Sequence, residues 1–451
     1  MTGRAAPPLE AGKAPRLGLA LSGGGDSTAL LLALRAAAPD LPLYAYIVDH
    51  ALRPESANEA RRTAAFAEKH GASVRVLRWD APRPGQGHAR AARHRLLAQA
   101  CRDDNVFTLC LAHTLDDRIE TLRMRASRSG PQASLAGPGP LDPSPVWPEG
   151  RGLVIARPFL DLTRDTLRGF LRRSGADWIE DPSNADPAYE RVRLRQAPIP
   201  ERAAQALLDR SNAARRAQAA ENAAALALIE RGARLTIWGG AILDRYAFAP
   251  GPEAFETTGG ARAFQTLVMA VSGRPAAPAP DLLRPGLDAL RHGRAWTGGG
   301  ALLTPAGVLG RDPGAAGRAD AGPDGPKAAS LHLEAFETGV FDGRFEITGP
   351  ARIGMLGDRR PAPSGSSFDA GFDPHDAPGP FRATLPHDTA SGAVLAHGSK
   401  LTGGETHLLC EARIAARLVA LKASAWFDGV FAEARACAAL AKRPARSNIG
   451  S

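Results

Sequence analysis

A short polar segment interrupts an apolar run near the start of the chain. Its residues are Ser22, Gly23, Gly24, Gly25, Asp26 and Ser27. Both flanks are continuously apolar, as for a buried strand and a buried helix, whereas a flexible linker has polar flanks. Glycines let backbone N–H groups approach an anion closely, and the N-terminus of the following helix adds further N–H groups. The pattern therefore predicts a phosphate-binding loop, although it lacks the lysine of a Walker loop.

A second polar group follows another apolar run. It consists of His113, Asp116, Asp117 and Glu120. On a helix that starts near Thr114, this spacing places His113, one of the two aspartates and Glu120 on one side. Helix capping is the alternative for Asp117, because Thr114 followed three residues later by an acid forms a capping box. Capping explains neither His113 nor Glu120, so the group is a candidate for catalysis.

A third pair, Asp49 and His50, ends the apolar run 43–48. Alone, such a pair more often makes a local hydrogen bond. Its significance depends on whether its strand end lies beside the other two groups.

Alternating apolar runs place these groups at one edge of a sheet. Strands are expected at 17–21, 43–48, 73–77, 106–112 and 153–156, and helices at 27–38, 56–70, 88–104, from 114, 163–174 and 202–231. Such alternation predicts an α/β fold, a parallel twisted sheet with helices on both faces. Ligands of these sheets bind at the carboxyl ends of the strands, where all three groups would meet. The Pro- and Gly-rich segment 131–152 is expected to be a loop.

A basic segment lies between the expected helices 163–174 and 202–231. Its arginines are Arg191, Arg193 and Arg195. In a helix Arg191 and Arg195 share a face, and in a strand all three do. Either arrangement suits contacts to RNA phosphates, with Tyr189 near enough to stack on a base. A solvated charged face is the alternative.

The composition favours an anionic partner. The net charge is +9, and only six of the 56 basic residues are lysine. Four cysteines without a CxxC pair exclude a disulfide scaffold and fit a reducing compartment. No run reaches the roughly 18 apolar residues that span a bilayer. We therefore expect a cytoplasmic protein with no membrane partner.

Five motifs occur in a distinctive order over residues 15–200. They are SGGGDS, VDHALRPES, ARAARHR at Ala89 to Arg95, AHTLDDRIET, and WIEDPSNADPAYERVRLR at Trp178 to Arg195. In this order they resemble the tRNA(Ile)-lysidine synthetase family of PP-loop ATP pyrophosphatases. The resemblance implies an adenine nucleotide alpha hydrolase-like fold and a ligase. Such an enzyme joins free lysine to the wobble cytidine of tRNA(Ile) with a CAU anticodon and releases AMP and pyrophosphate.

The resemblance also implies roles for the candidate residues. ATP would contact the segment 22–27 with Asp49 and His50, and Asp26 would hold Mg²⁺. His113, Asp116, Asp117 and Glu120 would position the metal, the lysine and charge. Arg191, Arg193 and Arg195 would bind RNA.

Two departures from the family pattern leave alternatives open. His94 stands where tyrosine is usual, and residues 129, 131 and 134 replace glycines of a loop. If that loop places the lysine or the cytidine, activity would be reduced. The alternatives are another PP-loop tRNA-modifying enzyme, a thiolase, or a degenerate RNA-binding protein without catalysis.

Three domains are expected. Residues 1–215 would form the catalytic domain, 216–315 a largely helical tRNA-binding middle domain, and 325–451 a small α+β domain that also binds tRNA. The sequence does not decide the oligomeric state, and a homodimer is left open.

Overall fold

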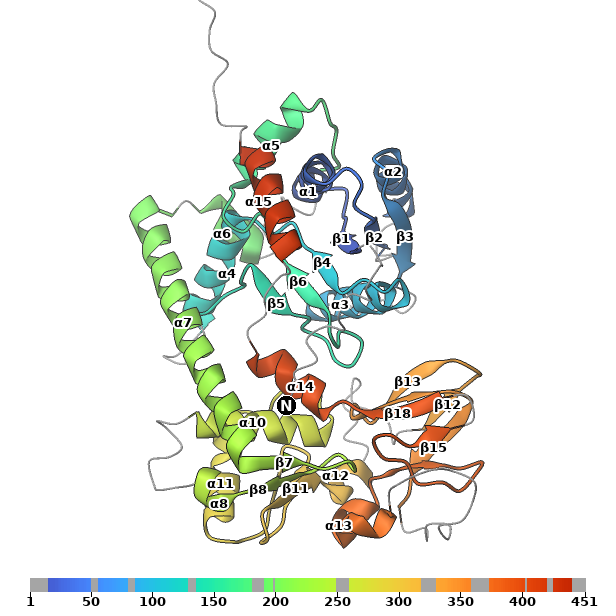
Figure 1. Ribbon diagram of the computed structural model, residues 1–451. Helices are drawn as coiled ribbons and strands as arrows, with labels where there is room; N and C mark the ends of the chain where they lie inside the picture. Colours follow the sequence, from blue (N-terminus) through green and yellow to red (C-terminus); the bar gives the residue numbers. More distant parts are fainter. Residues whose placement is uncertain are drawn as a thin grey trace, which may run out of the picture. The chain divides into compact units, whose positions relative to one another are not determined.

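Figure 1 shows the computed structural model of the chain. It describes residues 15–49, 56–79, 86–128, 135–180, 190–197, 199–248, 259–317, 330–357, 373–401, 404–419 and 425–439. The chain forms two compact units. The first unit comprises Arg4–Gln218 and Ala420–Ser451, and the second Met1–Gly3 and Ala219–Val419. The three expected domains stay a prediction.

A six-stranded sheet forms the centre of the first unit. Its strands, in spatial order, are β3 (Ser73–Arg78), β2 (Leu43–Asp49), β1 (Leu17–Ala20), β4 (Thr108–Cys110), β6 (Val154–Ala156) and β5 (Leu141–Pro143). The first five run parallel, with Leu19 opposite both Ala45 and Cys110. This confirms the parallel sheet. The edge strand β5 pairs antiparallel with β6 and lies in the segment expected to be a loop.

Helices cover both faces of this sheet. The helices of this unit are α1 (Gly25–Ala37), α2 (Ser56–Lys69), α3 (Gln86–Asp103), α4 (Leu115–Arg128), α5 (Arg164–Arg173), α6 (Glu190–Gln196), which packs on α4, and the start of α7 (Glu201–Gly232). Side chains of a strand alternate between faces. Accordingly, Leu19 joins a core with α1, whereas Ala20 and Tyr46 join a second core with α3. A sheet buried on both faces has the continuous apolar strands seen in the sequence.

The helix α15 (Ala425–Ala439) packs on α1 and α5, as Figure 1 shows in red beside dark blue. Phe427, Val430 and Phe431 are buried in the same core as Leu30 and Leu34 of α1. The chain therefore returns to its first unit after completing the second.

A five-stranded antiparallel sheet begins the second unit. In spatial order it contains β7 (Ala233–Leu235), β8 (Ala241–Leu243), β11 (Val308–Arg311), β10 (Ala301–Leu303) and β9 (Trp296–Gly298). The helices are α8 (Arg245–Phe248), α10 (Gly260–Ser272), α11 (Arg284–Arg291), α12 (Pro313–Gly317) and the 3₁₀ turn η2 (Pro280–Leu282). Helices were expected in this region, and the sheet was not predicted.

The rest of the second unit is α+β, as expected. One sheet is β12 (Leu331–Leu333), β15 (Ala351–Met355) and β16 (Pro386–Asp388); another is β13 (Thr338–Phe341), β14 (Phe345–Thr348), β18 (Gly404–Leu408) and β17 (Lys400–Leu401). The helical segments are η3 (Pro374–Asp376), α13 (Gly379–Arg382) and α14 (Cys410–Leu418). Within the described ranges, no helix has both the length and the apolar character needed to cross a membrane.

Candidate active site

The glycine-rich segment is an ordered turn between β1 and α1. The Ser22 N–H donates to Oγ of Ser27 over 3.2 Å, and this Oγ donates to the Gly24 carbonyl over 3.0 Å. Gly23 adopts φ +79°, and a Cβ there would lie 2.4 Å from Oγ1 of Thr63. These contacts exclude a flexible linker, as the apolar flanks predicted.

The N-terminus of α1 is open to an anion. Its N-cap is Gly24, which has no side chain to accept hydrogen bonds from the first turn. The Ile179 N–H donates to the Gly23 carbonyl over 2.9 Å and fixes the loop from the other side. The first-turn N–H groups therefore point out of a rigid loop, as a phosphate site requires.

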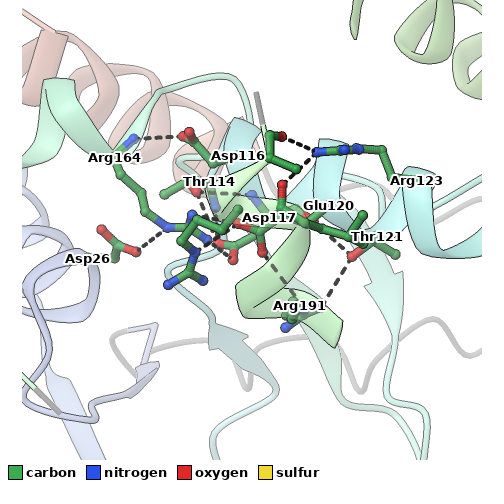
Figure 2. A network of polar contacts seen from close by, with 12 residues as sticks. Asp26, Thr114, Asp116, Asp117, Glu120, Thr121, Arg123, Arg164 and Arg191 are labelled. Carbon is green, nitrogen blue, oxygen red and sulfur yellow. Dashed lines mark hydrogen bonds and ion pairs between the residues drawn. The ribbon is translucent and has the colours of Figure 1, made fainter. Parts of the chain in front are cut away.

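Arg164, the first residue of α5, joins the acidic residues (Figure 2). Its Nη1 donates to Oε1 of Glu120 over 2.7 Å, its Nη2 donates to Oδ1 of Asp117, and its Nε lies 3.5 Å from Oδ2 of Asp26. Its backbone N–H donates to Oδ2 of Asp116 over 2.8 Å. Three expected catalytic carboxylates and Asp26 thus converge on one arginine.

The charges in this network stabilise one another. Burial alone would lower the pKa of Arg164, but hydrogen bonding and attraction to Glu120, Asp117 and Asp26 outweigh burial and raise it. Burial opposes the ionisation of Asp117, but Arg164 and the Thr114 N–H outweigh it and hold the pKa of Asp117 below its usual value. Asp117 is therefore ionised at neutral pH.

Asp26 differs from the other carboxylates. Burial raises its pKa to about 6, with Arg164 opposing the shift and Asp117 adding to it. Its side chain keeps 28% of its surface exposed. Asp26 is thus an accessible group that is poorly stabilised as an anion, and an added cation would stabilise it.

The capping interpretation of Asp117 is correct as well. Its Oδ2 accepts from the N–H of Thr114 over 2.9 Å and from Oγ1 of Thr114 over 3.0 Å. Because Oδ1 faces Arg164, one carboxylate both caps α4 and belongs to the acidic cluster.

Glu120 is buried and has one oxygen without a hydrogen bond. Oε1 accepts from Arg164 and, over 3.1 Å, from Nε of Arg195. Oε2 lies 3.8 Å from Nε of Arg191, too far for a hydrogen bond, and finds no other donor in the part of the chain that the structure describes. This oxygen keeps the capacity to accept a further hydrogen bond.

His113 lies three residues after the end of β4 and is held in one tautomer. Nε of Arg157 donates to its Nδ1 over 3.0 Å, so the ring proton is on Nε2. Burial lowers the pKa of His113 to about 3; Asp117 opposes the shift and Arg157 adds to it. Arg157 is fixed by Oδ2 of Asp142 over 2.6 Å. The unpredicted strand β5 thus positions a neutral histidine.

The arginines expected to bind RNA lie on the helix α6. Of the two conformations considered for this segment, helix and strand, the helix is therefore the correct one. Arg191 and Arg195 share a face and both approach Glu120. Arg193 is exposed. Nη1 of Arg123 on α4 donates to the Leu194 carbonyl over 2.6 Å and holds α6 in place.

Asp49 ends β2 at the same carboxyl edge, in the strand next to β1. His50, Tyr189 and loop residues 129–134 lie outside the described residues. Arg164 and Arg157 were not predicted as site residues. A signal existed for both: Arg157 follows the expected strand 153–156 directly, and Arg164 opens the next expected helix.

Comparison with known proteins gives consistent matches. Residues 4–202 match the family model of the PP-loop domain. The tRNA(Ile)-lysidine synthase of Hyphomonas neptunium is 45% identical over 187 residues, 41% of this chain and 51% of that protein. That of Caulobacter vibrioides is 44% identical over 192 residues, 42% and 46% of the two chains. That of Methylobacterium nodulans is 41% identical over 277 residues, 58% and 77%.

The first two matches thus span about half the length of those relatives. Among solved structures, the U34-tRNA thiolase from Methanococcus maripaludis is 15% identical with a TM-score of 0.38, over 46% of this chain and 72% of that chain. This similarity is too weak to carry a functional comparison.

Proposed function

The chain belongs to the tRNA(Ile)-lysidine synthase family, and from this premise we propose that it is a ligase that joins free lysine to the wobble cytidine of tRNA(Ile) with a CAU anticodon. ATP is the second substrate, and AMP and pyrophosphate are the products. A cytoplasmic location belongs to the same proposal.

One observation carries the proposal: an anion-binding loop lies beside an acidic cluster with an unsatisfied oxygen. The loop 22–27 offers N–H groups to phosphates, and Asp26 connects it through Arg164 to Asp117 and Glu120. Oε2 of Glu120 is buried and free to accept a hydrogen bond from a cation. A site of this kind suits a nucleoside triphosphate and an ammonium-bearing substrate together.

The reaction has two steps. The carbonyl oxygen at position 2 of the cytosine attacks the α-phosphorus of ATP, and the bond to the β-phosphate breaks to release pyrophosphate. The amine of lysine, having lost a proton, then attacks the activated base carbon, and the carbon–oxygen bond breaks to release AMP. Neither step needs a protein nucleophile, so positioning and charge stabilisation supply the catalysis.

Each group of residues has one task in this scheme. The N–H groups of loop 22–27 stabilise the charge on the leaving pyrophosphate, with Asp49 and His50 on the nucleotide side. Asp117 and Glu120 attract the lysine, while Asp116 holds the backbone of Arg164. His113 is neutral and carries its ring proton on Nε2, so Nε2 is available as a hydrogen-bond donor to a substrate.

The side chains of this site suit Mg²⁺ only if phosphate oxygens of the substrate supply the remaining metal ligands. In the described part of the chain, no group of three or more His, Cys, Asp or Glu side chains is arranged to hold a metal ion. Mg²⁺ is commonly held by one or two carboxylates plus substrate phosphates. Asp26, accessible and poorly stabilised as an anion, suits that role. When bound, the ion would neutralise phosphate charge.

RNA binding by Arg191, Arg193 and Arg195 is part of the proposal. Exposed Arg193 is accessible to a phosphate. Arg191 and Arg195 also contact Glu120, so RNA held by them would lie next to the lysine.

The test measures AMP and pyrophosphate release with tRNA(Ile) transcript, with and without lysine. We expect AMP release that requires both tRNA and lysine. A thiolase would require a sulfur donor in place of lysine, and a non-catalytic RNA-binding protein would bind the transcript without releasing AMP. Either result would contradict the proposal.

A further inference from the structure

A chain of three side chains connects the long helix α7 to His113. Nε of Arg157 donates to Nδ1 of His113 over 3.0 Å, and Nη1 of Arg157 donates to Oδ2 of Asp142 over 2.6 Å. The other oxygen of this carboxylate, Oδ1, accepts from both Nη1 and Nη2 of Arg215 on α7, each over 3.4 Å. We call Arg215, Asp142 and Arg157 the His113 relay. Each member contacts the next, from α7 to the histidine.

The backbone of the turn before β5 is also held by α7. Nη1 of Arg215 donates to the Gly137 carbonyl over 3.1 Å, and the buried Oγ of Ser211, one helical turn earlier, donates to the Ala136 carbonyl over 3.0 Å. A Cβ at Gly139 would lie 1.9 Å from Nη2 of Arg215. The guanidinium group therefore lies directly against this turn, and α7 fixes the segment that leads into β5.

Asp142 is the centre of the relay. Its Oδ2 also accepts from the Gly139 N–H over 2.9 Å, and Nη1 of Arg157 also donates to the Gly139 carbonyl over 2.8 Å. The side chain of Arg157 is 9% exposed, whereas those of Asp142 and Arg215 are 27% and 29% exposed. A buried charge is destabilised strongly when its partner is removed, and a partly exposed pair contributes less. The contact of Asp142 to Arg157 is therefore the stronger one, and that to Arg215 the weaker.

The relay determines which ring nitrogen of His113 carries the proton. A guanidinium group is a hydrogen-bond donor and never an acceptor. While Nε of Arg157 faces Nδ1, that nitrogen must accept, so the proton is on Nε2. If Arg157 turned away, either nitrogen could carry the proton, and Nε2 would be a donor in only part of the molecules.

We propose that Asp142 and Arg215 are positioning residues of the reaction. Acting through Arg157, they keep Nε2 of His113 a hydrogen-bond donor to the substrate. This inference rests on the proposed function, in which His113 donates from Nε2. Arg215 lies beyond the residues 4–202 that match the PP-loop domain, on a helix that continues into the second unit. The site thus depends on a helix that the PP-loop domain match does not include.

The first test substitutes both ends of the relay in the full chain and measures lysine-dependent AMP release. Asp142→Asn keeps the shape but removes the charge that holds Arg157, so kcat should fall about 10- to 100-fold. Arg215→Gln removes the weaker contact and should reduce kcat about threefold to fivefold. The KM values for ATP and lysine should stay within about twofold of wild type, because neither residue contacts a substrate in this scheme.

The matched control is Arg216→Gln. Arg216 is an exposed arginine next to Arg215 on the same helix, so its substitution removes the same charge without touching the relay. Its kcat should equal that of wild type. A reduction equal to that of Arg215→Gln would show an effect of net charge and overturn the inference.

Two further variants separate position from charge. Gly139→Ala displaces the guanidinium group of Arg215 and removes no charge, and it should reduce kcat about as much as Arg215→Gln. The double variant Asp142→Asn with Arg215→Gln should have the same kcat as Asp142→Asn alone, because Arg215 acts through Asp142. Multiplied effects in the double variant would show independent roles and contradict the relay.

The ring of His113 provides a readout that a merely structural role would not change. In the full chain labelled with ¹⁵N-histidine, the two ring nitrogen shifts show which nitrogen is protonated, and the spectrum of His113→Gln assigns the signal. Wild type and Arg216→Gln should carry the proton on Nε2, whereas Asp142→Asn should show a mixture of the two tautomers. An unchanged His113 ring in Asp142→Asn would overturn the inference even if kcat falls.

The remaining outcomes are also decisive. If Asp142→Asn fails to fold by circular dichroism, Arg215→Gln and Gly139→Ala decide through the same kinetic and spectroscopic measurements. Failure of the proposed function has a different signature: the wild type would release no lysine-dependent AMP, while the change of the His113 tautomer in Asp142→Asn would persist.

Discussion

Two arginines, one in each unit, have different surroundings. Arg164 belongs to the candidate active site, whereas Arg344 belongs to an ion-pair cluster inside the fold. Arg344 in the second unit is 1% exposed, donates from Nε to Oδ2 of Asp342 over 2.8 Å and from Nη2 to the Thr384 carbonyl over 2.7 Å. Arg311 also contacts Asp342, at 3.3 Å. Burial is the main cause that lowers the pKa of Arg344.

Arg164 has the opposite surroundings. Several carboxylates surround one guanidinium group at the edge of a sheet where loops meet. The interior cluster is closed and has two arginines for one carboxylate, whereas the edge cluster gathers Asp26, Asp117 and Glu120 around Arg164 and keeps Asp26 partly exposed. The difference teaches that the edge cluster keeps one carboxylate, Asp26, accessible, whereas the closed cluster of Arg344 serves the fold.

The largest expected effect is that of Asp26→Asn on catalysis. Without this carboxylate, lysine-dependent AMP release should fall about a thousandfold. Initial rates at saturating ATP measure it. A rate within about threefold of wild type would remove Asp26 from the mechanism, because that factor is far below the effect of a catalytic group.

The same substitution should stabilise the first unit. A folded pKa of about 6 against 3.8 unfolded means that the contribution of Asp26 to stability is most favourable below about pH 4 and is lost as pH rises to about 6. Asp26→Asn should remove this decrease, worth up to about 3 kcal/mol at pH 7. Urea unfolding at pH 4 and pH 7 measures it, and an unchanged pH dependence would contradict it.

Arg344→Ala should destabilise the second unit by about 3–5 kcal/mol, because it leaves Asp342 buried without its closest partner. Hydrogen–deuterium exchange of β14 measures the change. Arg294→Ala removes an exposed ion pair to Asp288 and serves as the control, with an expected destabilisation under about 1 kcal/mol. Equal destabilisation by the two substitutions would show that burial does not determine how much these ion pairs contribute to stability.

Glu120→Gln should raise the KM for lysine roughly 10- to 100-fold while the KM for ATP stays within about twofold. The amide keeps the shape but not the charge that attracts an ammonium group. Steady-state kinetics with each substrate varied separate the two constants. A change confined to ATP would place Glu120 on the nucleotide instead.

The smallest effect is expected for Arg191→Ala with Arg195→Ala. RNA binding should weaken severalfold, and the salt slope should fall by about one for each phosphate that is no longer bound. Titrations of tRNA(Ile) transcript at several salt concentrations measure both. Binding curves of the variant that match those of the wild type at every salt concentration would show that these arginines do not bind RNA and act only on Glu120.

The parts of the site that are local in the chain were predictable. The loop 22–27 was recognisable because its glycines stand between buried flanks, and the Thr114–Asp117 capping box because its partners are three residues apart. Parallel strands such as β2 and β3 were visible as apolar runs.

Contacts between distant segments were not predictable. Arg164 reaches Glu120 only because the turn before α5 docks on α4, where the Leu115 N–H donates to the Leu162 carbonyl over 2.9 Å. The three-residue strands β7 to β10 are too short for periodicity to reveal. An apolar helix face such as that of α15 does not say which element it covers.

The packing of α15 on α1 has a consequence for biosynthesis. A ribosome delivers α1 (Gly25–Ala37) before the second unit and α15 (Ala425–Ala439) after it, so the surface of Leu30 and Leu34 that α15 covers stays exposed while the second unit is translated. Nascent chains with such surfaces are substrates for chaperones. Stalled or prematurely terminated products would therefore contain a first unit with exposed apolar surface, which favours aggregation.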